Sequence, residues 1–153
     1  MLLYKNGQFH CGKVSFALPN DCLLLTVEQE SYYPFGLTLA DTTESYTLDA
    51  HFIHADEAPQ ESLSEIVASV TVDLFETISY EKNGVCGCYA AYHDKHNYYL
   101  EFALETDTGI EDEDGEPVNT LSVVIYADSE SAIKKAASDT LVWELLDSIQ
   151  ITK

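Results

Sequence analysis

The sequence predicts a single α+β domain, 1–153, in which one antiparallel β-sheet is flanked by helices as an α/β/α sandwich. Three observations predict this class. The 153-residue chain has the size of one ordinary domain and shows neither a repeat nor an interdomain linker. Apolar residues alternate with polar ones through most of the chain, which is the period of strands. Two segments, at about 60–73 and 130–149, instead repeat every three to four residues, as amphipathic helices do.

The first half of the chain is predicted to be all β before the helix at 60–73. Asn6–Gly7 is a strong signal for a two-residue turn and predicts an opening hairpin over 2–9. Alternating residues then indicate four short strands. They lie at 14–18, 23–27, 37–39 and 46–54, with a looser segment around 32–34.

The first helix is predicted from the change of period after Ala58. Pro59 suits the first turn of a helix, where its missing N–H costs nothing, and Glu61 lies near the positive end of the helix dipole. The apolar stripe that predicts the helix over 60–73 is formed by Leu63, Ile66, Val67, Val70 and Leu74.

The stretch from Val85 to Leu104 reads as two strands joined by a polar turn at 94–97, after a strand that contains Ile78 and Tyr80. The residues from 98 to 104 alternate as in a strand with one buried face. A loop over 106–119, a strand at 121–125 and a helix over 130–149 follow. Asp128 or Ser129 can cap this helix, which is expected to break near Ser138–Asp139.

Charge is the most unusual property of the composition. The chain has 27 acidic residues against 7 lysines and no arginine, and its formal net charge is −20. Such a surface repels phosphate groups, which argues against nucleic acid and anionic membranes as partners. A protein partner is therefore expected to be cationic or apolar, while a simpler interpretation is that the charge only keeps the protein soluble.

The location predicted from the sequence is cytoplasmic. The apolar runs of the sequence are far shorter than the roughly 20 residues of a membrane helix, and the apolar segment 1–4 is too short for a signal-peptide core. Four cysteines in such a chain are expected to be free thiols, and Cys11 and Cys22 to behave as small buried apolar residues.

The order of the predicted elements and three short motifs resemble the PsbP-like superfamily. The motifs are Phe16-Ala17-Leu18-Pro19 with Asp21, Gly87 after the first helix, and 145–149 near the end. This fold, an antiparallel sheet between helices, occurs in a photosystem II subunit, a nuclear Ran-binding protein, and bacterial DcrB and Eag secretion chaperones. The resemblance implies a non-enzymatic binding or adaptor module with no shared catalytic site and no cofactor.

A metal- or thiol-dependent site is the alternative hypothesis from the residues. The residue types that bind zinc are found at Cys86, Cys88, His93 and His96, although the two cysteines are two apart on a strand and His93 is expected to point to the other face.

The acidic loop at 107–116 contains Asp112-Glu113-Asp114-Gly115, part of a calcium-loop pattern. The end positions of that pattern fall on Ile110 and Leu121, which cannot ligate, so loose attraction of cations is the expectation there.

Four of the ten tyrosines cluster on the predicted hairpin: Tyr89, Tyr92, Tyr98 and Tyr99. Half-buried tyrosines commonly pack at the edge of a core, and exposed ones anchor interfaces. The preferred hypothesis is a binding domain that contacts a protein partner through the sheet face or these aromatic side chains. It predicts an exposed apolar groove or patch beside acidic residues.

Overall fold

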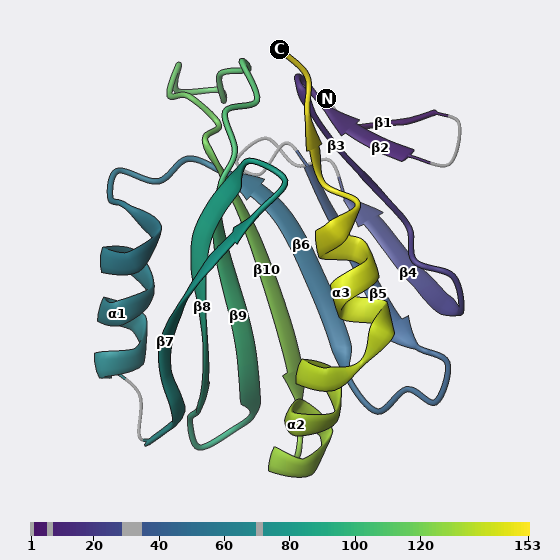
Figure 1. Cartoon of the computed structure of the whole chain (residues 1–153), viewed down its shortest axis with the longest axis vertical. Helices are drawn as coiled ribbons and strands as arrows, with labels where there is room; N and C mark the ends of the chain where they lie inside the picture. The colour runs from purple at the N-terminus through teal and green to yellow at the C-terminus, as the bar shows by residue number, and fades with distance from the viewer. Residues whose placement is uncertain (1, 6–7, 29–34, 70–71) are drawn as a thin grey trace.

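The chain forms two antiparallel sheets rather than one. The computed structural model describes residues 2–5, 8–28, 35–69 and 72–153. Its larger sheet has the strand order β4-β5-β6-β10-β9-β8-β7 and its smaller sheet the order β1-β2-β3-β11 (Figure 1). The α+β class and the antiparallel pairing are confirmed, whereas the single flanked sheet is not. The strands are β1 (Leu2–Lys5), β2 (Gln8–Cys11), β3 (Val14–Ala17), β4 (Cys22–Glu28), β5 (Phe35–Asp41), β6 (Thr47–Ile53), β7 (Val72–Lys82), β8 (Val85–His93), β9 (Tyr98–Glu105), β10 (Thr120–Ala127) and β11 (Gln150–Ile151).

The second sheet arises because the start and the end of the chain pair with each other. Lys5 pairs with Gln8 across the expected hairpin, whose turn residues Asn6 and Gly7 lie outside the described residues. Gln150 then pairs with Ser15, so β11 closes this sheet beside β3. A strand of two residues shows no alternation, and the sequence therefore gave no indication of it.

The first helix, α1 (Pro59–Ser69), begins where the sequence indicates but ends earlier than predicted. Val72 pairs with His93 at the start of β7, so residues 72 and 73 belong to a strand and the predicted end at 73 is wrong. Valine favours strands, and pairing along β8 outweighs the helical spacing of the apolar residues there.

The C-terminal segment forms two helices, α2 (Glu130–Ser138) and α3 (Thr140–Asp147). Ser129 caps α2 by accepting a hydrogen bond from the amide of Ala132 (3.2 Å). Asp139 between the helices has an extended backbone, which confirms the predicted break. None of the helices in the described part of the chain is both long and apolar enough to span a membrane.

The helices lie on opposite faces of the larger sheet. α2 and α3 lie in front of the central strands in Figure 1, and α1 lies beside β7 and β8. The main core lies between the larger sheet, the smaller sheet and α2–α3, while a small second core lies under α1. Its buried members are Leu63, Cys88, Ala90, Tyr92 and Ala103.

The hairpin β8–β9 has the predicted strands and turn. The Asp94 carboxylate accepts hydrogen bonds from the amides of His96 and Asn97, both at 2.8 Å, which closes the turn at 94–97. Gly87 is required by close packing of the backbone: a Cβ atom there would lie 2.1 Å from the carbonyl oxygen of Ala103. The hairpin therefore tolerates no side chain at position 87.

Candidate functional site

One face of the larger sheet is only partly covered by a helix. On the face opposite α2 and α3, α1 packs against β7, β8 and β9. In the described part of the chain α1 makes few contacts with β5, β6 and β10, and no other helix lies on that side (Figure 1). We call this area the outer face. Its half-buried side chains are Thr38, Thr47, Asp49, His51, Ile53, Ser122, Val124 and Tyr126.

A row of tyrosines crosses the outer face from beneath α1. Strand register places Tyr92, Tyr99 and Tyr126 directly opposite one another on β8, β9 and β10. The Tyr92 and Tyr99 rings stack with their centroids 5.0 Å apart. Tyr92 is buried and Tyr126 is half-buried, so the row ends in the uncovered area. Tyr126 was not singled out from the sequence, although alternation along β10 places it on the opposite face from the buried Ile125.

The outer face is acidic as well as aromatic. The Asp49 carboxylate accepts a hydrogen bond from Thr38 Oγ1 at 2.8 Å. Burial raises the pKa of Tyr126, and the nearby Asp49 charge raises it further. β5, β6, β9 and β10 contain no lysine. A partner that covers this face should therefore bring apolar or cationic side chains.

The four tyrosines singled out in the sequence do not form one surface. Tyr92 and Tyr99 lie on the α1 side of the sheet, whereas Tyr89 and Tyr98 lie on the side of the main core. The Tyr89 ring stacks on Phe102 with centroids 4.9 Å apart, and Tyr98 packs on His93 at 4.9 Å. Alternation along each strand separates the two pairs, because neighbouring side chains point to opposite faces.

The structure also separates the cysteines and histidines of the alternative hypothesis. Cys86 is exposed near one end of β8, and Cys88 is buried under α1. His93 lies at the other end of β8, about 23 Å from Cys86 at the rise of a strand. His96 lies exposed in the next turn. Burial raises the pKa of the Cys88 thiol to about 11, and the Glu101 charge adds to this shift. The reactive thiolate form is therefore disfavoured at neutral pH.

Backbone amides of the acidic loop hold the Asp112 carboxylate in place. The Asp112 Oδ1 atom accepts hydrogen bonds from the amides of Asp114 (2.9 Å) and Glu116 (3.0 Å). Gly115 donates to the Asp112 carbonyl oxygen, with a backbone φ of 78° that suits glycine. Within the described residues, no group of three or more His, Cys, Asp or Glu side chains is arranged to hold a metal ion.

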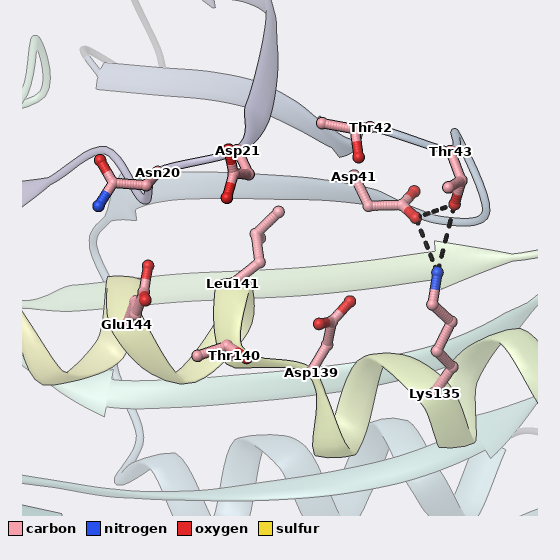
Figure 2. Close-up of a pocket in the computed structure, with 10 residues that line it drawn as sticks. All are labelled: Asn20, Asp21, Asp41, Thr42, Thr43, Lys135, Asp139, Thr140, Leu141 and Glu144. Carbon is pink, nitrogen blue, oxygen red and sulfur yellow. Dashed lines mark hydrogen bonds and ion pairs between the residues drawn. The ribbon is translucent and has the colours of Figure 1, made fainter.

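A polar cavity of about 340 Å³ lies on the other side of the sheet, where the break between α2 and α3 meets the end of β5 (Figure 2). Lys135 reaches from α2 to the Asp41 carboxylate, with Nζ and Oδ2 3.0 Å apart, and also donates to Thr43 Oγ1 at 3.2 Å. The Tyr46 hydroxyl donates to Asp139 Oδ2 at 2.8 Å. These contacts tie the α2–α3 break to the sheet, which is a structural role.

Asp41 is the most constrained carboxylate of this cavity, with 4% of the residue exposed. Burial alone would raise its pKa. Hydrogen bonds from Thr43, Lys135 and the amides of Tyr46 and Ser45 instead hold the pKa well below its ordinary value of 3.8. The charged form is therefore favoured by folding.

Asp41→Asn is expected to lower the free energy of unfolding at pH 7 by about 1–3 kcal/mol, because hydrogen bonds to a charged acceptor are lost. A depressed pKa stabilises the fold above the ordinary pKa, and this contribution begins to decline as pH falls below about 4. Urea unfolding at pH 7 and pH 3 should thus show a smaller difference between wild type and variant at pH 3. Asp114→Asn in the exposed loop is the control, with little effect at either pH. A constant difference for Asp41→Asn at both pH values would contradict the account.

Comparisons with known proteins identify no family for this chain. No family model matches it, and no curated protein does so either. Among solved structures, it is similar to LpqN, described as involved in cell envelope biogenesis of Mycobacterium tuberculosis. The two share 12% sequence identity over 92% of this chain and 83% of that chain, with a TM-score of 0.46.

Proposed function

We propose that this chain is a non-enzymatic binding domain that holds a protein partner on its outer face. The observation that carries the proposal is that α1 covers β7, β8 and β9 while β5, β6 and β10 keep half-buried aromatic, aliphatic and acidic side chains. Exposed sheet faces of mixed polarity with aromatic anchors are typical of protein interfaces. A PsbP-like fold and a cytoplasmic location, which the sequence predicts, are part of the same proposal.

The chemistry of the face favours a basic or apolar partner over an acidic one. Asp49 of β6 and Glu101 of β9 lie in one row across the sheet, on either side of Val124 of β10. The whole chain carries a net charge of −20, so an anionic partner would be repelled over a long range. The hairpin aromatics are the weaker part of the original hypothesis, because Tyr89 and Tyr98 belong to the opposite side of the sheet.

Tyr126→Ala is expected to reduce the amount of partner recovered with the tagged chain from its native cell by about tenfold or more. Loss of a buried aromatic anchor costs about 2 kcal/mol or more at an interface. Tyr98→Ala is the matched control, because it removes the same half-buried ring from the opposite side of the sheet. Thermal unfolding of both variants checks that each remains folded.

Two outcomes would contradict the proposed function. If Tyr98→Ala removes the partner and Tyr126→Ala does not, the interface lies on the other side of the sheet. If no protein is recovered in a fixed ratio with the wild-type chain, the binding role itself is wrong.

A further inference from the structure

A narrow cleft lies at the border of the outer face, between α1 and the sheet. Ile53 of β6 and Ser122 of β10 belong both to this cleft and to the outer face. Pro59 and Ile66 of α1 form the opposite wall. The volume is about 120 Å³, below the roughly 300–1,000 Å³ of pockets that hold free small molecules. The cleft therefore has room for one side chain rather than for a whole metabolite.

The Glu101 carboxylate lines this cleft from the middle of β9. The Tyr92 hydroxyl donates to Glu101 Oε1 at 3.1 Å, and in the described part of the chain no second hydrogen-bond donor to this carboxylate is found. Burial raises the pKa of Glu101, and the Tyr92 hydrogen bond offsets only part of that effect. A carboxylate withdrawn from water in this way gains from any cation that reaches it.

The geometry favours an ammonium group over a guanidinium group. A guanidinium binds best when both oxygens of a carboxylate accept its fork, and at Glu101 that fork would have to share Oε1 with the Tyr92 hydroxyl. An ammonium is compact and has three donors. The Ser62 and Ser122 hydroxyls line the same cleft and can accept the donors that Glu101 does not take. The apolar walls suit a methylene stem.

We propose that this cleft receives a lysine side chain of the partner protein, with its ammonium group on Glu101. The inference rests on the proposed function, because the lysine would belong to a partner that lies on the outer face. Charge supports this occupant: Glu57 is a second acidic residue of the cleft, and no lysine among the described residues lines it. The site thereby defines the partner as one that presents a lysine beside an apolar contact surface.

The probe for this site is a capped lysine, Nα-acetyl-lysine methylamide, titrated into the full chain and followed by amide chemical shifts. We expect localised shifts at Glu101, Ala103 and Ser122. Glu101→Gln keeps the shape of the side chain and removes its charge, and it should weaken the binding by about tenfold or more. Capped norleucine, which has the stem without the ammonium, should leave these amides unchanged.

Glu105→Gln is the matched control, because Glu105 lies on the same strand and face but outside the cleft. It should change the binding by less than about twofold. The inference is overturned if capped lysine leaves the cleft amides unchanged up to about 100 mM. It is also overturned if the shifts are the same in Glu101→Gln and wild type.

The two proposals fail separately. If capped lysine does not bind the cleft while partner recovery still depends on Tyr126, the lysine inference alone is wrong. If capped lysine binds through Glu101 while partner recovery is insensitive to Tyr126, the cleft is real and the outer face is not the interface.

Discussion

Replacement of Phe16 by alanine is expected to lower the free energy of unfolding by about 3–5 kcal/mol, the cost of removing a phenylalanine from a packed core. Phe16 of β3 is 1% exposed. Its ring stacks on Phe9 at 5.7 Å and on Phe52 at 6.0 Å between centroids. Because Phe9 belongs to the smaller sheet and Phe52 to the larger one, this stack joins the two sheets. Urea unfolding followed by circular dichroism measures the change.

The control for this substitution is Ile151→Ala in the same small sheet. Ile151 is 37% exposed, so its loss should change the free energy of unfolding by less than about 1 kcal/mol. A similar small effect for Phe16→Ala would show that the smaller sheet does not share the core of the larger one, and would contradict the two-sheet packing described above.

Leu63→Ala is expected to have the second large effect, a loss of about 2–5 kcal/mol in the free energy of unfolding. Leu63 is fully buried and packs α1 against the core that contains Cys88, Ala90 and Tyr92. Without it, α1 has much less apolar area on the sheet. Amide hydrogen exchange across 59–69 should therefore accelerate more than exchange in β10.

Ser64→Ala on the exposed side of the same helix is the control, with an expected change within about 0.5 kcal/mol. The substitution also bears on the cleft, since Pro59 and Ile66 reach it from α1. Leu63→Ala could instead leave both the free energy of unfolding and amide exchange in α1 unchanged. The position of the helix, and of the cleft wall that it forms, would then not depend on this core.

Local sequence patterns predicted most of the individual strands, turns and helices of the fold. The β8–β9 hairpin, its turn at 94–97 and the break at Asp139 depend on alternation and on capping residues that are neighbours in the sequence. The pairing of β6 with β10 joins segments about seventy residues apart, and β11 has only two residues. Such contacts depend on the whole chain, so local pattern could not reveal the second sheet or the early end of α1.

The candidate site was predicted only in part for the same reason. Alternation along β8 and β9 shows on which face of its own strand each of Tyr92 and Tyr99 lies. Only the order of the strands in the sheet shows that Tyr126 lies beside them. The width of the area that α1 leaves uncovered depends on how the 54–58 connection positions the helix. No residue type in that connection predicts it. In the sequence, Glu101 has the pattern of a solvent-facing strand residue. Only the packing of α1 on the sheet shows that it lines a cleft.

The proposed function requires that a partner covers the outer face. Hydroxyl-radical footprinting of the chain, alone and in the complex recovered from its native cell, tests this requirement. We predict that oxidation of Tyr126 and Ile53 falls in the complex, while oxidation of Tyr98 on the opposite side of the sheet does not change. Protection confined to Tyr98 or to the exposed Leu23–Leu25 edge, with Tyr126 oxidised equally in both samples, would contradict the claim.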